Sequence, residues 1–354
     1  MSRFQGSRLL RLVPYTPGEQ PTDMQYVKLN TNESPFPPSE KAIAKAAEAA
    51  ELLQLYPDPE CSALCKAFAE QCGVDPKNVV AGNGSDEILN FAFLAFCDED
   101  TPAVFPDISY GFYPVFAELN GVPYRQIPLR EDFSVNIEDY QDKKGMIVIA
   151  NPNAPTGLTL SVAEVEKLLL AHPDQVVLID EAYVDFGAES CIPLIRKYDN
   201  LLVVQTFSKA RSMAGARLGF GIASEGIIAD LNTVRYSTNP YNINRMTMAA
   251  GIGVLADEAY TQKNLQTVIQ NRENTAAKLK ELGFVLTASK SNFLFAKHPK
   301  ADGEVLYRKL KERGVLVRHF NKPRISDYVR ITVGSAEQMQ VLLTQLSEIL
   351  EELL

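Results

Sequence analysis

The apolar run Leu201-Leu202-Val203-Val204 is followed closely by Thr206-Phe207-Ser208-Lys209-Ala210-Arg211, and this stretch decides the fold. An uninterrupted apolar run of this length is typical of a buried strand, so Lys209 is expected at the edge of a buried sheet. A second run, Val176-Val177-Leu178-Ile179, ends in Asp180. The sequence therefore places an amine and a carboxylate at the ends of two buried strands.

Lys209 and Asp180 have two interpretations. Burying a charged group costs free energy unless a partner compensates it, so one interpretation is an ion pair between the two side chains. The other is that both contact pyridoxal phosphate, whose aldehyde forms a Schiff base with lysine and whose ring nitrogen needs an anionic partner. These two residues alone do not decide between the interpretations.

Apolar runs alternate with helical patterns between about residues 79 and 223. The strands expected there cover residues 79–81, 103–105, 146–149, 176–179, 201–204 and 220–222. Continuous apolar strands separated by helices predict an α/β fold, with a mostly parallel sheet sandwiched by helices. A helix is also expected from Ser39 to Ala50, and a long helical stretch from about Asn244 to Leu282.

The pattern changes beyond residue 282. Strands are expected at residues 293–296 and 328–333, with a short helix around 303–313 and a final helix from about 336 onward. This order indicates a smaller α+β domain. The first forty residues are rich in proline and asparagine and predict an irregular arm that completes it. The predicted organisation is an arm over residues 1–40, a large cofactor-binding domain over 41–250 and a small domain over 251–354.

The composition is that of a soluble globular protein, with 46% hydrophobic and 22% charged residues among 354. The net charge of -9 argues against nucleic-acid binding. No apolar run approaches the roughly 20 residues that span a bilayer, and the N-terminus lacks the apolar core of a signal peptide. The five cysteines have no paired framework spacing, so we expect free thiols, no metal site and a cytoplasmic location.

Polar motifs follow the expected strands, where ligands bind in an open parallel sheet. Residues 82–87, Gly-Asn-Gly-Ser-Asp-Glu, open a helix whose amides suit a phosphate, although a plain helix cap explains them about as well. Tyr110 follows another strand and either stacks on a flat ring or packs in the core. An Asn-Pro-rich turn covers residues 151–157, Tyr183 lies one helical turn after Asp180, and Arg217 can bring a guanidinium to a phosphate.

In this order the motifs resemble those of the fold-type-I, aspartate-aminotransferase-like enzymes that use pyridoxal phosphate. Within that superfamily the chain resembles the histidinol-phosphate aminotransferase family over essentially its whole length. Five segments carry the resemblance: residues 28–35 (Lys-Leu-Asn-Thr-Asn-Glu-Ser-Pro), 56–58 (Tyr-Pro-Asp), 180–186 (Asp-Glu-Ala-Tyr-Val-Asp-Phe), 206–210 (Thr-Phe-Ser-Lys-Ala) and 329–334 (Val-Arg-Ile-Thr-Val-Gly).

The resemblance implies a role for each candidate residue. Lys209 bonds to the cofactor and later moves a proton, Asp180 pairs with the ring nitrogen, and Tyr183 hydrogen-bonds the phenolic oxygen. Further cofactor contacts are implied for Gly84, Ser85, Asp86, Tyr110, Asn153, Thr206, Ser208 and Arg217. Tyr56 reaches the phosphate of the neighbouring subunit, which implies a homodimer with shared active sites. Substrate contacts are implied for Tyr15, Asn32, Arg318 and Arg330.

The implied reaction is transamination between L-histidinol phosphate and 2-oxoglutarate, which gives imidazole-acetol phosphate and glutamate in histidine biosynthesis. An aromatic-amino-acid aminotransferase and a phosphothreonine decarboxylase are alternatives that use the same cofactor site. A regulatory domain needs a fused DNA-binding segment, and an NAD-binding protein needs a glycine fingerprint that is missing here.

One position departs from the family pattern. The turn usually reads Asn-Pro-Asn-Asn-Pro-Thr-Gly, and the asparagine before Pro-Thr-Gly donates to the cofactor's phenolic oxygen. Here that position is Ala154, which has no donor. Either Asn153 or a water fills the place, or Tyr183 alone supports the oxygen. The prolines restrict the turn and favour Asn153.

Overall fold

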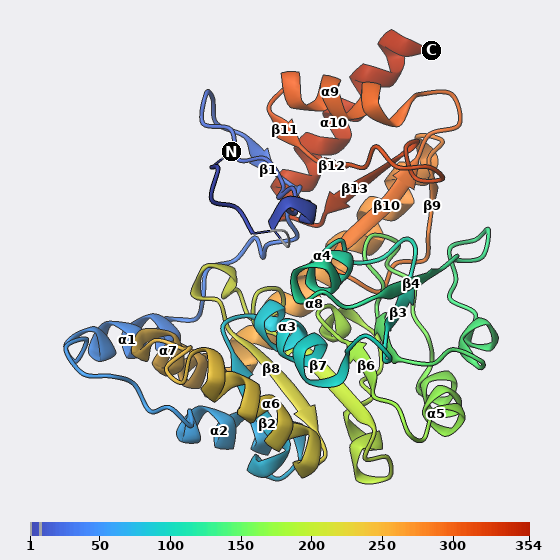
Figure 1. The fold of residues 1–354 in the computed structure, drawn as a ribbon. Coiled ribbons are helices and arrows are strands. Elements are labelled where there is room, and N and C mark those ends of the chain that lie inside the picture. The colour runs from blue at the N-terminus through green and yellow to red at the C-terminus, as the bar shows by residue number, and fades with distance from the viewer. Residues whose placement is uncertain (1, 7–8) are drawn as a thin grey trace.

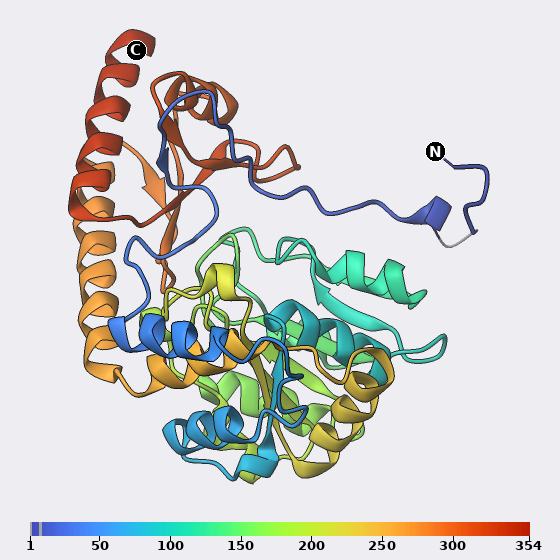
Figure 2. The same cartoon turned by 90° about the vertical axis from the view of Figure 1, so that its left-hand side faces the viewer.

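The computed structural model describes residues 2–6 and 9–354. Figure 1 shows a body built around a central sheet, with a smaller unit above it to which the C-terminal part of the chain contributes. Helix α8 (Glu258–Glu281) runs alongside the body toward the smaller unit, and helix α10 (Ala336–Leu353) continues upward on the same side in Figure 2.

The central sheet has seven strands in the order β2-β8-β7-β6-β5-β3-β4. Strand β8 is antiparallel to β2 and β7, and the other neighbouring pairs are parallel, so the predicted mostly parallel sheet is confirmed. Strand β4 was not predicted, because its first three residues are exposed at the sheet edge and form no apolar run. The strands are β2 (Val79–Gly82), β3 (Ala103–Pro106), β4 (Tyr124–Ile127), β5 (Met146–Ala150), β6 (Val177–Asp180), β7 (Leu201–Thr206) and β8 (Gly219–Ala223).

Helices cover both faces of this sheet. One face packs against α1 (Glu40–Ala50), α2 (Ser62–Cys72), α5 (Val162–Ala171) and α7 (Arg245–Leu255). The other packs against α3 (Ser85–Phe96), α4 (Tyr113–Asn120) and α6 (Glu225–Thr238). Alternate residues of β5 enter the two cores, with Ile147 on one side and Val148 on the other. Burial of both faces is why these strands appear in the sequence as unbroken apolar runs.

The smaller unit contains a four-stranded antiparallel sheet in the order β12-β13-β10-β9. Its elements are β9 (Val285–Leu286), β10 (Phe293–Lys297), α9 (Gly303–Glu312), β12 (Arg318–His319), β13 (Tyr328–Thr332) and α10. The helical stretch predicted for residues 244–282 is two helices, α7 and α8. The break falls at Asp257, whose backbone leaves the helical region at φ −129° and ψ 51°.

The N-terminal arm joins the smaller unit through β1 (Val27–Lys28), which pairs in parallel with β11 (Val315–Leu316). Before β1 the arm leaves that unit and extends away from the body on the side of α4 (Figure 2). Apolar side chains are exposed along the described part of this extension, including Phe4 and Val13. The start of the described arm is therefore exposed, whereas its later part, from Tyr15 to Lys28, contacts the rest of the protein.

No helix among the described residues is long and apolar enough to cross a membrane. All five cysteines are free. Burial raises the pKa of the Cys61 thiol to about 11 and that of Cys65 to about 12. Both thiols are consequently protonated and poorly reactive at neutral pH.

Candidate active site

Lys209 lies just beyond the carboxyl end of β7, half-buried between the sheet and the arm. Its Nζ donates to the backbone carbonyl of Thr31 at 3.3 Å, and no described carboxylate lies within 4.0 Å of it. The ion pair with Asp180 that the sequence left open is therefore not formed. Exclusion of water, reinforced by nearby Arg330, lowers the pKa of Lys209 to about 8. A lysine of this kind is partly unprotonated near neutral pH and can act as a nucleophile or base.

Asp180 ends β6 and is 4% exposed. Its Oδ2 accepts a hydrogen bond from the Tyr113 hydroxyl at 2.9 Å, and its Oδ1 accepts one from the Ala182 amide at 3.2 Å. Burial raises the pKa of Asp180 to about 6, although both hydrogen bonds act in the opposite direction. No described cation lies within 4.0 Å of this carboxylate. The site thus holds a fixed acceptor that a cationic ring nitrogen would satisfy.

The first turn of α3 forms one end of the same site. Gly84, at its N-cap, has φ +82°, and a Cβ there would lie 2.5 Å from Arg217 Nη2. A Cβ at Gly219 on β8 would lie 2.2 Å from the backbone nitrogen of Ser85. Glycine at both positions lets the free amides of the helix and the Arg217 guanidinium approach one point. Helix amides and a guanidinium together form a phosphate-binding site.

Asp86 organises this end of the site through its carboxylate. Oδ1 accepts from the Tyr110 hydroxyl at 2.8 Å, and Oδ2 pairs with Arg217 Nη2 at 2.8 Å. On the other side, the Thr206 hydroxyl donates to Ser208 Oγ at 2.9 Å. The aromatic ring, the guanidinium and the hydroxyls are therefore held in place by contacts among the side chains themselves.

These groups line a cavity of about 150 Å³ at the carboxyl ends of β5, β6 and β7. It brings together nine of the residues singled out from the sequence, namely Ser85, Asp86, Tyr110, Asp180, Tyr183, Thr206, Ser208, Lys209 and Arg217. A larger cavity of about 690 Å³ adjoins it and shares Tyr110, Ala154, Tyr183 and Lys209. A planar ring in the smaller cavity would therefore face the larger one.

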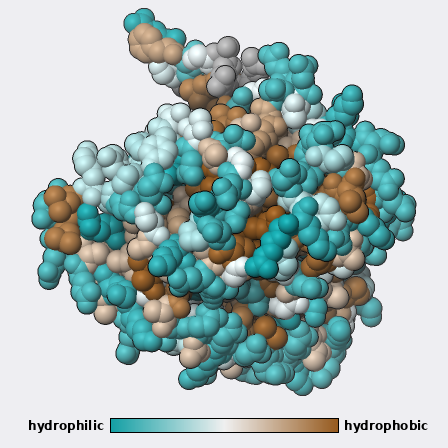
Figure 3. All heavy atoms as spheres, turned by 90° about the horizontal axis from the view of Figure 1, so that it is seen from below, coloured by the Kyte–Doolittle hydropathy of each residue, from teal (hydrophilic) through white to brown (hydrophobic). Residues whose placement is uncertain are grey.

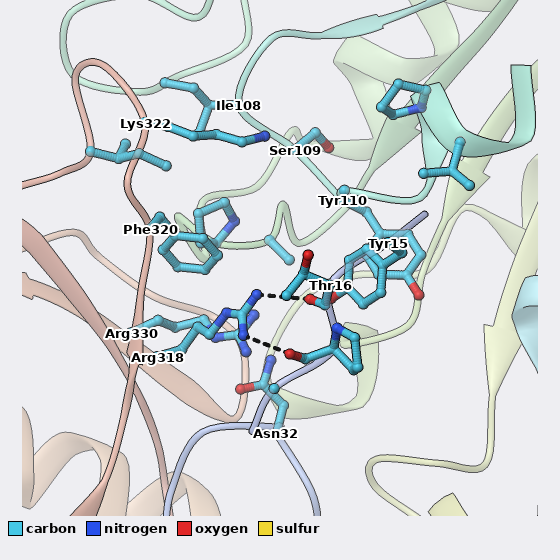
Figure 4. Close-up of a pocket in the computed structure, with 18 of the residues that line it drawn as sticks. Tyr15, Thr16, Asn32, Ile108, Ser109, Tyr110, Arg318, Phe320, Lys322 and Arg330 are labelled. Atoms are coloured by element: carbon cyan, nitrogen blue, oxygen red, sulfur yellow. Dashed lines mark hydrogen bonds between the residues drawn. The ribbon is translucent and has the colours of Figure 1, made fainter. Parts of the chain in front are cut away.

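The larger cavity contains the four residues expected to hold substrate, Tyr15, Asn32, Arg318 and Arg330 (Figure 4). Arg330 Nη2 donates to the Asn30 carbonyl at 2.9 Å, but its buried Nε has no partner. No described carboxylate pairs with Arg330, so an anionic ligand would complete its hydrogen bonding.

Two further contacts fix the arm side of this cavity. Arg318 donates to the carbonyls of Thr16 at 3.0 Å and Pro17 at 3.1 Å, both on the arm (Figure 4). The Tyr15 ring stacks on Phe112 with centroids 4.3 Å apart. The arm therefore forms a wall of the cavity.

Comparison with known proteins decides the family. Residues 24–346 match the model of the aminotransferase class I and II family. The chain is 49% identical to the histidinol-phosphate aminotransferase of Acinetobacter baumannii (strain AB307-0294), over 95% of this chain and 94% of that protein. It is 46% identical to that of Brachyspira hyodysenteriae, over 99% of this chain and 100% of that protein.

The chain belongs to the histidinol-phosphate aminotransferase family. The fold agrees with that of the histidinol-phosphate aminotransferase from Sinorhizobium meliloti, solved in complex with pyridoxal-5'-phosphate, at a TM-score of 0.90 and 23% identity. That similarity covers 100% of this chain and 99% of the other. The protein is thus an aminotransferase of fold type I.

Three candidate residues of this aminotransferase line neither cavity: Gly84, at the N-cap of α3, Asn153 and Tyr56. Asn153 is buried, with its amide donating to the Ile108 carbonyl at 3.0 Å and to Thr156 Oγ1 at 3.1 Å, and its Oδ1 accepting from Ser109 at 2.7 Å. The expectation that Asn153 fills the place of the missing donor is therefore not met, because the turn uses that amide for its own structure. Ala154 lines both cavities instead.

Tyr56 lies on the surface of the protein. It is 78% exposed, stacks on Tyr241 at 4.6 Å and does not line either cavity of its own chain. Conversely, no role was predicted for Tyr113, which contacts Asp180. The available signal was a second tyrosine three residues after Tyr110, beyond the end of the same strand.

Proposed function

We propose that this aminotransferase transfers the amino group of L-histidinol phosphate to 2-oxoglutarate with pyridoxal 5'-phosphate as cofactor, a step of histidine biosynthesis. The observation that carries the proposal is the guanidinium of Arg330, which pairs with no described carboxylate, has no hydrogen-bond partner at Nε and faces a large cavity next to Lys209, in a chain 49% identical to a histidinol-phosphate aminotransferase. Both substrates carry anionic groups that such a guanidinium binds.

The smaller cavity fits the cofactor at each of its chemically distinct ends. Lys209 supplies an amine of lowered pKa for covalent attachment. Asp180 supplies a buried anion for the ring nitrogen, and Tyr110 supplies an aromatic face. The amides of Ser85 and Asp86, with Ser208 and Arg217, supply donors for the phosphate.

When bound, pyridoxal phosphate stabilises the electron pair left when the substrate loses its α-proton. Lys209 Nζ, whose lowered pKa of about 8 leaves part of the amine unprotonated near neutral pH, would be the base that takes this proton and the acid that returns it. Asp180, whose Oδ2 is held by Tyr113, would hold the ring nitrogen and favour its protonated form. The Tyr183 hydroxyl accepts from Asn32 Nδ2 at 2.9 Å, so its own hydrogen is free to be donated to the phenolic oxygen.

The larger cavity is the proposed substrate site. Arg330 binds the phosphate of the amino donor or a carboxylate of the acceptor, with Arg318 and Asn32 beside it. Tyr15, carried by the arm, covers the ring of the substrate. The arm contacts made by Arg318 use two of its five donors and leave the others for an anion.

We further propose a cytoplasmic homodimer with shared active sites. Tyr56 is exposed and lines neither cavity of its own chain, so we assign it to the cofactor phosphate of the partner subunit. Beside it, Leu52, Leu53 and Leu55 are 45%, 57% and 56% exposed. Seen from below, an apolar projection stands at the edge of the molecule where α1 lies (Figure 3). A second copy of the chain would cover this surface.

The domain division proposed from the sequence is kept. Residues 1–40 form the arm, 41–250 the large domain and 251–354 the small domain. The apolar residues of α8, Leu265, Val268 and Leu279, pack into the core of the small domain and support the assignment of this helix to it.

A substrate panel tests the reaction. The rate at which the bound cofactor is converted to its pyridoxamine form is measured with histidinol phosphate, phenylalanine, tyrosine and phosphothreonine. Histidinol phosphate is expected to react fastest, and 2-oxoglutarate to restore the original absorbance. Faster conversion by phenylalanine or tyrosine would indicate an aromatic aminotransferase instead. Release of carbon dioxide from phosphothreonine would indicate a decarboxylase.

A further inference from the structure

The loop between β12 and β13, residues 320–327, reaches from the small-domain sheet to the body of the protein. Three of its residues, Phe320, Lys322 and Ile325, line the large cavity (Figure 4). The position of this loop therefore sets one wall of the proposed substrate site. The contacts that hold this loop in place therefore determine the shape of that wall.

Arg324 makes the polar connection between this loop and the body. Its Nη1 pairs with Asp107 Oδ2 at 3.3 Å, and its Nη2 donates to the carbonyls of Leu129 at 2.9 Å and Arg130 at 2.6 Å. Asp107 follows β3 directly, and Leu129 lies shortly after β4. One guanidinium thus joins the small-domain loop to the ends of two neighbouring strands of the central sheet.

The surroundings of Arg324 reinforce this connection. Asp107 Oδ1 also accepts from the Leu129 amide at 2.9 Å, so the two strand ends are tied to each other. The guanidinium carbon lies 5.5 Å from the centroid of the Phe133 ring. An apolar cluster then joins Ile108, Leu129 and Phe133 of the body to Phe295, Ile325 and Tyr328 of the small domain.

The backbone at Arg324 is in an unfavourable conformation, so the contacts of its side chain offset a local conformational cost in free energy. Its φ of +69° lies in the left-handed region, which a residue with a Cβ adopts unfavourably. Asp107 is followed by Ile108, Ser109 and Tyr110, all of which line the large cavity. The Arg324 contacts therefore connect two neighbouring walls of the large cavity, residues 108–110 and residues 320–325.

We propose that Arg324 is a positioning residue that clamps loop 320–327 onto the body and so shapes the substrate site, while leaving the cofactor site unaffected. It touches neither cavity and acts through Asp107 and the two carbonyls. This inference rests on the proposed function, since the loop is a wall of the site assigned there to substrate.

Two substitutions distinguish the effect of losing the guanidinium from the effect of the strained backbone at residue 324. Arg324→Gly removes the side chain and relieves the positive φ, whereas Arg324→Ala removes the side chain and keeps the strain. Both should raise KM for the amino donor and for 2-oxoglutarate by about tenfold, the effect of losing one net charge-assisted hydrogen bond. The kcat and the cofactor affinity should stay within about twofold of wild type, and Arg324→Gly should be the more stable variant.

Arg130→Ala is the matched control. The Arg130 side chain pairs with Asp139 at 3.1 Å, away from the loop, while its carbonyl remains available to Arg324. This variant removes the same charge from the same region and should leave KM unchanged. A rise in KM equal to that of Arg324→Gly would overturn the proposal, because it would assign the effect to surface charge.

Hydrogen exchange gives a readout that does not depend on turnover. In Arg324→Gly, amides of residues 107–110 and 320–327 should exchange faster, while those at the start of α3 should not. The proposed role of Arg324 would be overturned if Arg324→Gly changed neither the exchange rates nor KM while the wild-type protein turned over histidinol phosphate. A wild-type protein that fails to use histidinol phosphate would instead overturn the proposed function.

Discussion

The Tyr113 hydroxyl donates to Asp180 Oδ2 at 2.9 Å inside the protein, where Asp180 is only 4% exposed. The carboxylate that faces the cofactor cavity is thereby oriented by a residue on the first turn of α4. A buried carboxylate with so few donors is sensitive to the loss of one of them.

Tyr113→Phe should therefore destabilise the cofactor-free protein in a pH-dependent way. The pKa of Asp180 is raised to about 6 in the folded protein, so the folded state disfavours the charged form and stability falls as pH rises through that value. Loss of the Tyr113 donor lowers the free energy of unfolding only where Asp180 is ionised. The expected decrease is about 1.5–3 kcal/mol at pH 8 and much less at pH 5. Urea unfolding at both pH values measures the difference. Equal destabilisation at both would show that Tyr113 matters only for packing.

The lowered pKa of Lys209 predicts the pH dependence of cofactor attachment. Only the unprotonated amine attacks an aldehyde, so the attachment rate should rise with pH and level off above about 8, the pKa of Lys209. Stopped-flow absorbance after mixing the cofactor-free protein with pyridoxal phosphate measures this rate. Lys209→Ala is the control and should show no borohydride-reducible link. A midpoint above pH 10 would contradict the lowered pKa.

Arg330→Ala should weaken binding of histidinol phosphate and of 2-oxoglutarate and leave cofactor affinity almost unchanged. Loss of a charge-assisted bidentate contact costs about 2–3 kcal/mol, or roughly 30- to 150-fold in affinity. Arg330→Lys keeps the positive charge but not the pair of parallel N–H donors of the guanidinium. It should therefore recover only part of the lost binding affinity. An equal loss of cofactor affinity would place Arg330 at the cofactor phosphate.

A shared active site predicts complementation between two impaired subunits. Lys209→Ala and Tyr56→Phe subunits mixed in equal amounts should recover up to about a quarter of the wild-type activity, because half of the dimers are mixed and each has one intact site of two. Size-exclusion chromatography with differently tagged subunits checks that mixed dimers form. If they form and no activity returns, Tyr56 serves its own chain or has no role.

Ala154 predicts the effect of restoring a donor. Asn153 is committed to Ile108 and Thr156, so Ala154→Asn should add a hydrogen bond to the cofactor's phenolic oxygen. A bond to the anionic form favours that form, so the pKa of the lysine–cofactor link should fall by about one. Titration of the visible absorbance against pH measures it. No change would mean that a water already supplies the bond.

The sequence predicted the parts of the fold that depend on burial alone. The strands before Asp180 and Lys209 are buried on both faces, so their apolar runs were clear. Strand β4 was missed because Tyr124, Arg125 and Gln126 are exposed at an edge, where pairing with β3 rather than burial defines the strand.

The site was predictable where a residue type is tied to one chemistry, as with Lys209. The site was not predictable where a side chain can point either into the cavity or into the surrounding protein. Asn153 turns toward Ile108 and Thr156 because the buried turn must satisfy its own polar groups. Arg324 was missed because its partners lie far away in the sequence, at Asp107 and Leu129.

Arg330 has one more consequence, which concerns the protein between turnovers. A buried Nε without an acceptor and a guanidinium without a carboxylate partner should allow the proposed substrate site to bind small anions other than substrate. We expect inorganic phosphate and dicarboxylates in the surrounding solution to bind there, and the occupied fraction to rise with their concentration until the site is saturated. Each such anion stabilises the folded chain by mass action and competes with substrate. The apparent affinity of the enzyme for its substrates should therefore depend on the anions in the buffer. It should be highest in buffers without phosphate or dicarboxylates.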